Sequence, residues 1–150
     1  MKTETKYFGE VEFEKEDILR FRKGLFGFED EREFLVIPFS ENGTLYSLQS
    51  VATPQLSFVL MHPFSLDPGY APVLQEEELA ELKVEKSEDL FYYTMCAMKD
   101  PISESTVNLK CPIAINEGTR QAVQVILENG PYFMRHRLAD FTEEKGDAPC

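Results

Sequence analysis

The sequence predicts a mainly β protein: a small antiparallel β-barrel-like single domain with one or two short helices. Short apolar runs alternate with turn signals along the chain, and very few segments show the 3.6-residue period of an amphipathic helix. The 150 residues are 43% apolar and 12% aromatic, which is enough for one domain, residues 1–150, with its own core. About eight strands in this length favour a barrel or two packed sheets.

The first half of the sequence contains four expected strands, at residues 7–13, 34–39, 44–50 and 58–61. In the first strand, Tyr7, Val11 and Phe13 would share one face. The strongest turn signal is Ser40-Glu41-Asn42-Gly43, because Asn-Gly tolerates positive φ. The second and third strands are therefore expected to pair antiparallel, and Pro63 should end the fourth.

The second half contains a central strand, a hairpin and one helix. Residues 90–98 are apolar on both faces, as in a central strand. Residues 111–115 and 122–128 are expected to pair around a turn at 116–119. Only residues 75–82 show a helical pattern, in which Leu79 and Leu82 would face inward. Residues 132–141 fit a short helix or strand, and about 143–150 form an expected frayed tail.

Charge limits the classes of partner. Fifteen Lys and Arg residues against 27 Asp and Glu residues give a net charge of −12, which argues against direct binding of nucleic acid or an anionic membrane. An acidic surface suits a basic protein partner or maintains solubility. No run approaches the ~20 apolar residues of a membrane span. Residues 1–6 contain no apolar signal region, so a cytoplasmic location is expected.

The sequence offers no motif for catalysis, and we expect no catalytic residues, metal or cofactor. His62 and His136 stand alone, without a second ligand at metal-binding spacing. Cys96, Cys111 and Cys150 form no CxxC pair and fit reduced thiols. Residues 24–27 lack the ending of a phosphate-binding loop. A small β-barrel ligand carrier or enzyme stays open as the alternative function, although it would need convergent polar groups in a pocket.

Two acidic blocks stand out, at residues 29–33 and 76–89. Such blocks can be merely solvated faces. They can also be electrostatic docking surfaces, which speed association with a basic partner and select it more than they add affinity. Both interpretations are open for Glu76, Glu77 and Glu78.

A set of ordered motifs resembles the FliW family of flagellar assembly factors, over roughly residues 7–138. The most specific is Phe21 with Lys23-Gly24-Leu25-Phe26-Gly27-Phe28-Glu29, which is similar to the family's F-x-x-G-L-x-G-F-E element. The other matching pieces are Leu48-Gln49-Ser50, Pro68-Gly69-Tyr70 and residues 58–63, 75–82, 108–116 and 120–124. Ser47, where an aromatic is common, and Cys111, where Ala is common, depart from the family pattern.

This resemblance implies a barrel-like protein without catalytic activity that binds two protein partners. One is CsrA, the RNA-binding translational regulator that represses flagellin synthesis, and the other is flagellin. Free protein would hold CsrA away from its messenger RNA, and accumulating flagellin would displace CsrA. Such a partner switch depends on linked binding equilibria.

The expected partner-binding residues are Gly27, Phe28, Leu48, Gln49, Ser50, Glu76, Glu77, Glu78, Asn108 and Asn116. Amphipathic flagellin segments would need an apolar groove, for which Phe8, Phe26, Phe28 and Leu48 are candidates. For each of these four, a place in the core is the competing interpretation. Gly24 and Gly27 are expected to serve backbone geometry, and Asn116 a turn.

Overall fold

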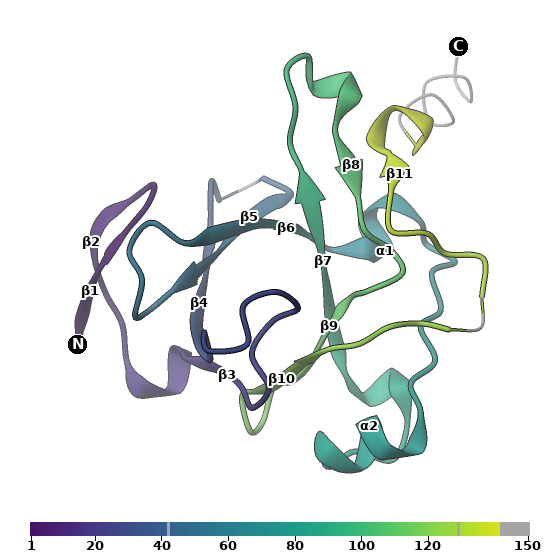
Figure 1. Ribbon diagram of the computed structural model, residues 1–150, viewed down its shortest axis with the longest axis horizontal. Coiled ribbons are helices and arrows are strands. Elements are labelled where there is room, and N and C mark those ends of the chain that lie inside the picture. Colours follow the sequence, from purple (N-terminus) through teal and green to yellow (C-terminus); the bar gives the residue numbers. More distant parts are fainter. Residues whose placement is uncertain (42, 129, 142–150) are drawn as a thin grey trace.

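The chain folds around a closed barrel of seven strands in a computed structural model that describes residues 1–41, 43–128 and 130–141 (Figure 1). The barrel strands are β3 (Leu19–Phe21), β4 (Glu33–Pro38), β5 (Leu45–Ser50), β6 (Ser57–Met61), β7 (Phe91–Ala97), β9 (Ile113–Asn116) and β10 (Gln121–Gln124). Sequential antiparallel pairs join β3 through β7, and β9 pairs with both β7 and β10. The parallel pairing of β10 with β3 completes the ring.

Alternation along the strands separates two apolar clusters. Phe34, Leu48, Leu60 and Ile113 point into the barrel and are fully buried. Neighbouring residues point outward, as the two-residue period of a strand requires. On β7, for example, Phe91 and Tyr93 pack inside the barrel, whereas Tyr92 packs in a second cluster outside it.

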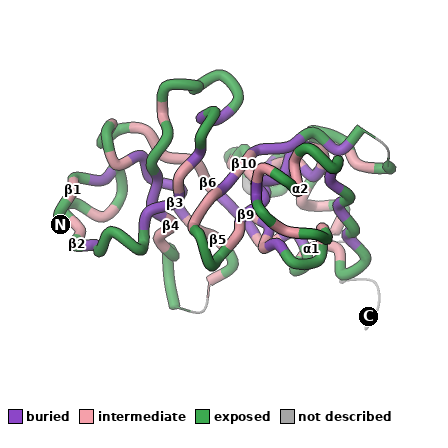
Figure 2. Tube along the Cα trace, turned by 90° about the horizontal axis from the view of Figure 1, so that it is seen from below, coloured by how far each residue is buried: buried purple, intermediate pink, exposed green. Residues whose placement is uncertain are grey.

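The second cluster lies between the barrel and a group of elements that pack against one side of it. These are α1 (Pro63–Leu66), α2 (Glu76–Glu81), β8 (Thr106–Val107), β11 (His136–Arg137) and the helical residues 138–141 (Figure 1). Its buried members include Tyr70, Leu82, Leu109 and Leu127. In Figure 2, buried segments run from the barrel strands into this half of the molecule, and exposed segments lie around them.

A separate hairpin flanks the opposite side of the barrel. Strands β1 (Lys2–Thr5) and β2 (Gly9–Glu12) pair antiparallel and form their own two-stranded sheet (Figure 1). A third small cluster of Phe13, Ile18 and Leu35 fixes this part of the chain to β4. Three short 3₁₀ turns complete the secondary structure of the described residues: η1 (Lys15–Asp17), η2 (Ser87–Asp89) and η3 (Ile102–Glu104).

The predicted mainly β, barrel-like fold is confirmed, with several local differences. The expected strand 7–13 begins only at Gly9, because residues 6–8 form the turn of the β1–β2 hairpin and leave Tyr7 half exposed. The predicted pairing of β4 with β5 is present. Asn42 of its turn and the expected frayed tail at 143–150 lie outside the described residues. Within the described part of the chain, no helix is sufficiently long and apolar to cross a membrane.

Candidate functional site

The motif at residues 23–29 forms a tight loop between β3 and β4, called the motif loop below. Leu25 and Phe28 face each other across a β-bridge, with the Phe28 N–H donating to the Leu25 carbonyl at 2.8 Å. Leu25 is buried in the barrel, and the Phe26 N–H donates to Gln124 Oε1 of β10 at 3.0 Å. The loop is therefore held to the barrel at its base and on one flank.

Both glycines of the motif occupy left-handed backbone, in agreement with the predicted role in backbone geometry. Gly24 has a φ of +68°, and a Cβ there would lie 2.5 Å from the Glu29 carbonyl oxygen. Gly27 has a φ of +84° with open space around it, and its N–H donates to Glu29 Oε2. Gly24 thus permits a close approach of two backbone segments, whereas Gly27 permits only the turn.

The loop presents two phenylalanines to solvent. Phe26 is 48% exposed and Phe28 is 41% exposed, although Phe28 also packs edge-on against Phe58 at 5.3 Å. Phe26 borders a small apolar pocket of about 220 Å³ beside Ala122 and Val123. Of the four candidate groove residues, these two have the surface that a partner could contact, whereas Leu48 is fully buried and Phe8 is half-buried.

Leu48, Gln49 and Ser50 lie inside the protein, with no exposed side-chain surface. The Gln49 amide joins separate segments: its Oε1 accepts from the Lys6 N–H at 2.9 Å, and its Nε2 donates to the Pro54 carbonyl at 3.0 Å. Ser50 Oγ donates to Glu31, which also accepts a 2.7 Å bond from the Thr53 hydroxyl. These residues support the loops around β5 and form no binding surface themselves.

The acidic helix α2 matches the predicted segment almost to the residue. Leu82 is fully buried and Leu79 packs against the same cluster, so the helix presents its acidic side outward. Glu76 and Glu77 are exposed. Glu78 differs, because its carboxylate accepts a 2.9 Å bond from the Gln75 N–H and completes a capping box.

An ion pair connects the motif loop to α2. Lys23 Nζ lies 3.2 Å from Glu81 Oε1, and the Glu81 side chain is only 17% exposed. The exposed phenylalanines and the acidic helix are therefore neighbouring surfaces, although the two segments are far apart along the chain.

Asn108 and Asn116 use their side chains to shape the backbone. Asn108 Oδ1 accepts from the N–H groups of Lys110 and Cys111. Asn116 Oδ1 accepts from the Gly118 N–H at 2.9 Å, and its Nδ2 donates to the Leu82 carbonyl at 2.8 Å. The predicted turn role of Asn116 is confirmed, and the same residue anchors the end of α2 to the β9–β10 turn.

Comparison with known proteins identifies the family. The sequence model of the FliW protein matches residues 2–138. The chain belongs to the FliW family. The flagellar assembly factor FliW of Geobacillus kaustophilus (strain HTA426) is 41% identical over 138 residues, which cover 92% of this chain and 95% of the relative. The FliW of Clostridium kluyveri (strain NBRC 12016) is 34% identical over the whole of both chains.

The same family accounts for the fold. A crystal structure of the flagellar assembly factor FliW superposes with a TM-score of 0.85 at 39% identity, covering 92% of this chain and 96% of the solved one. The motifs from which the FliW resemblance was inferred thus lie in a chain with the FliW fold.

Cys96, Cys111 and His62 of this FliW-family chain lie in structural surroundings, and Cys150 lies outside the described residues. Burial raises the pKa of the Cys96 thiol to about 12 and also raises that of Cys111. Burial lowers the pKa of His62, whose ring stacks on Tyr93 at 4.8 Å and whose Nε2 lies 3.0 Å from the Tyr46 hydroxyl. Among the described residues, no group of three or more His, Cys, Asp or Glu side chains could hold a metal ion.

The FliW fold also creates an apolar groove that the sequence did not indicate. Its volume is about 340 Å³, and its walls include Phe64, Tyr70, Val73 and Tyr92. Phe64 is 44% exposed, comparable with Phe26. The family motif Pro68-Gly69-Tyr70 was the available signal, but the groove arises only when α1 and β7 pack together.

Proposed function

We propose that this chain is a non-enzymatic flagellar assembly factor that works as a partner switch between CsrA and flagellin. CsrA bound to this chain would no longer bind its messenger RNA. Accumulating flagellin would displace CsrA from this chain and so release it. Membership of the FliW family carries the proposal, since the relatives are named flagellar assembly factors and match most of the chain.

The acidic surface around α2 supports CsrA as one partner. Glu76 and Glu77 are exposed on α2, and Glu85, Glu88 and Asp89 are exposed just after it. A protein that binds RNA presents basic residues to phosphates. Acidic residues that face the basic RNA-binding surface of CsrA would attract CsrA. They would also disfavour an RNA bound next to them, by like-charge repulsion.

The exposed loop supports flagellin as the other partner. Phe26 and Phe28 offer aromatic surface at the tip of a loop whose base is fixed by Leu25 and Gln124. Amphipathic segments bind through such apolar anchors, and a fixed loop avoids the entropy cost of ordering on binding.

The pair Lys23–Glu81 supports competition between the two partners. It holds the loop next to α2, within the footprint of roughly 800 Å² that an ordinary protein interface covers on each partner. A protein bound to either surface would then exclude the other partner, and flagellin would displace CsrA by mass action.

A gel-shift titration tests the switch. CsrA bound to flagellin leader RNA should release the RNA as this chain is added, and flagellin added next should restore the CsrA–RNA complex. This chain alone should leave the RNA unshifted, as its net charge of −12 predicts. A CsrA–RNA complex unaffected by the chain, or a release that flagellin does not reverse, would contradict the proposal.

A further inference from the structure

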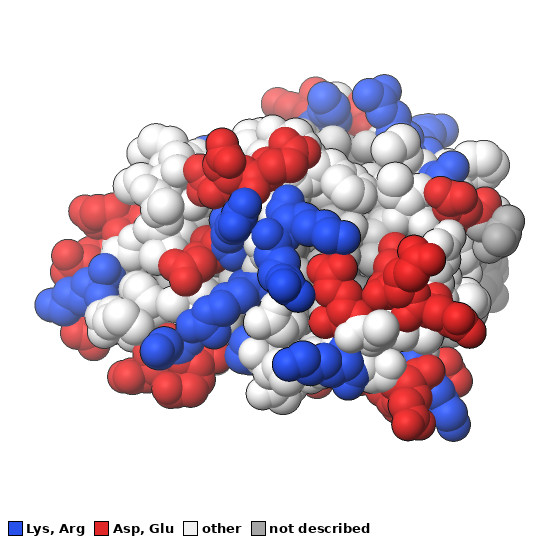
Figure 3. All heavy atoms as spheres, turned by 60° about the horizontal axis from the view of Figure 1, so that its bottom comes forward, with Lys and Arg blue, Asp and Glu red and all other residues white. Residues whose placement is uncertain are grey.

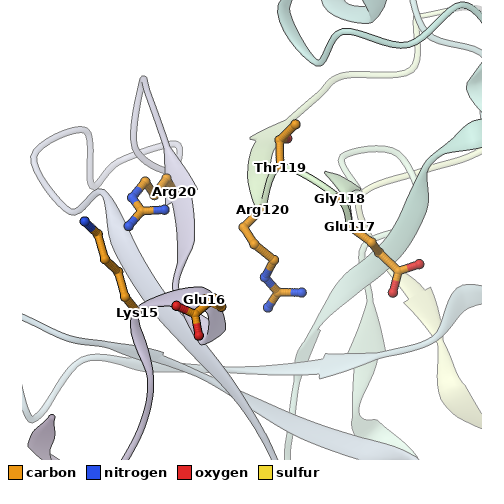
Figure 4. Close-up of a pocket in the computed structure, with 7 residues that line it drawn as sticks. All are labelled: Lys15, Glu16, Arg20, Glu117, Gly118, Thr119 and Arg120. Atoms are coloured by element: carbon orange, nitrogen blue, oxygen red, sulfur yellow. The ribbon is translucent and has the colours of Figure 1, made fainter.

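A basic pocket lies between η1, β3 and the β9–β10 turn. Its volume is about 430 Å³, and it is lined by Lys15, Glu16, Arg20, Glu117, Gly118, Thr119 and Arg120. Lys15 and Arg20 come from η1 and β3 on one side, and residues 117–120 form the other side (Figure 4). Figure 3 shows Lys and Arg side chains gathered in the middle of one face, with acidic side chains on either side.

The three cations of this basic pocket have no acidic partner among the described residues. The cations that form ion pairs among the described residues are Lys2, Lys23 and Arg137, and all three lie outside this pocket. These three cations lie together in one pocket, although the protein has 27 acidic and only 15 basic residues. Glu16 and Glu117 also line the pocket, so three positive and two negative groups leave one net positive charge. An added anion would relieve the repulsion among the cations.

Arg120 is held in place at local cost. Its φ is +63°, a left-handed backbone that non-glycine residues adopt only when the surroundings impose it. Its Nη2 donates to the Asp17 carbonyl at 3.1 Å, while its Nε is buried without a hydrogen-bond partner. Its carbonyl accepts from the Arg20 N–H at 2.9 Å, which fixes the two arginines relative to each other. The Arg120 guanidinium is thereby positioned before any ligand arrives.

We propose that the basic pocket binds carboxylate side chains of an acidic segment on a partner protein. The planar guanidinium fork matches a carboxylate with two parallel hydrogen bonds. The pocket is wide and open to solvent, which suits a side chain presented by a larger molecule. A nucleic acid, which carries a phosphate charge at every nucleotide and extends beyond the pocket, is disfavoured by the overall charge of −12, whereas a short acidic segment places its charge only at the local cations. None of the lining residues belongs to either surface of the proposed switch.

NMR titration of the ¹⁵N-labelled full chain tests the ligand class. An acetylated, amidated tetraglutamate peptide should give saturable shifts at backbone amides of residues 15–20 and 117–121, and these should weaken as salt is added. The matched tetraglutamine peptide should give none. Inorganic phosphate forms the third arm: saturation by phosphate at lower concentration than by tetraglutamate would overturn the carboxylate assignment in favour of a free anion.

Arg20→Gln provides the decisive variant. The Arg20 side chain makes no hydrogen bond or ion pair with the described residues, so the fold should persist, as an unchanged spectrum away from the pocket will show. Its affinity for tetraglutamate should fall about tenfold or more, since charge-assisted bonds are the strong ones. Lys99→Gln removes the same charge outside the pocket and should bind like the parent. Equal affinities for Arg20→Gln and the parent chain, or shifts confined to other residues, would overturn the proposal.

Discussion

Lys23 Nζ lies 3.2 Å from Glu81 Oε1 although the two side chains differ greatly in exposure, 78% for Lys23 and 17% for Glu81. Glu81 Oε2 is buried and has no hydrogen-bond partner among the described residues. The Lys23 ammonium group can be solvated without Glu81, whereas the buried oxygen of the Glu81 carboxylate has no access to water. Removing the lysine should therefore affect both the motif loop and the end of α2.

Lys23→Ala and Glu81→Ala should couple weakly in a double-mutant cycle. An ion pair with one exposed partner contributes about 0.2–1 kcal/mol, and less at high salt. Urea unfolding of the two single variants and the double variant at low and high salt measures the coupling. A coupling that does not fall at high salt would contradict the expected screening of this ion pair by solvent ions.

Glu76→Lys with Glu77→Lys should slow association with CsrA more than it speeds dissociation. Exposed charges steer encounter, and the effect should shrink as salt rises. The matched control is Glu4→Lys with Glu128→Lys, which makes the same charge change at exposed positions elsewhere. Stopped-flow association at low salt decides: equal rates for the two variants would make α2 an ordinary solvated face.

Glu78→Ala should behave differently from its two neighbours, because Glu78 closes the capping box of α2. Losing a cap bond costs about 1 kcal/mol of stability. The free energy of unfolding should fall by about that amount in Glu78→Ala and remain nearly unchanged in Glu77→Ala. Equal stability of the two variants would mean that the cap contributes nothing.

Phe26→Ser should weaken flagellin binding about tenfold or more, since exposed aromatics that become buried in an interface dominate its energy. Phe64→Ser is the matched control, because Phe64 is 44% exposed against 48% for Phe26 and lines the separate apolar groove. Calorimetric titration of both variants with flagellin compares the two surfaces. If Phe64→Ser alone loses affinity, flagellin binds in the groove instead.

Gly24→Ala should destabilise the protein by about 3 kcal/mol, because a left-handed alanine would also press against the Glu29 backbone. Gly27→Ala meets only the backbone cost, about 1–2 kcal/mol, since no atom lies within 4 Å of the place that its Cβ would take. Urea unfolding should rank the two in that order. The reverse order would remove the argument for close approach at Gly24.

Much of this architecture could be predicted from the alternation of apolar and polar residues along the strands. The strands around Phe34, Leu48 and Leu60 carry apolar side chains at regular spacing, and α2 combines inward leucines with a capping signal. Strand β1 was missed because Lys2–Thr5 contains no apolar residue; backbone pairing and the ion pairs of Lys2 with Glu10 and Glu12 join it to β2.

The site was harder to predict for a different reason. Gln49 and Ser50 are polar residues within one of the family motifs, so a partner contact was a reasonable expectation, yet their hydrogen bonds are made inside the protein. The basic pocket joins η1 and β3 to a turn about a hundred residues later, as the 103-residue separation of Asp17 and Arg120 illustrates. Only the closed barrel brings such segments together, and no local pattern encodes that contact.

The parallel pairing of β3 with β10 also bears on how the protein is made. Phe26 and Gln124, which bond across this seam, are 98 residues apart, so most of the chain must leave the ribosome before the barrel can close. Until then β3 presents an unpaired backbone edge, and apolar side chains of the barrel interior are exposed to solvent. Folding that depends on such distant contacts is slow. We expect the nascent chain to need protection from aggregation until β10 has emerged.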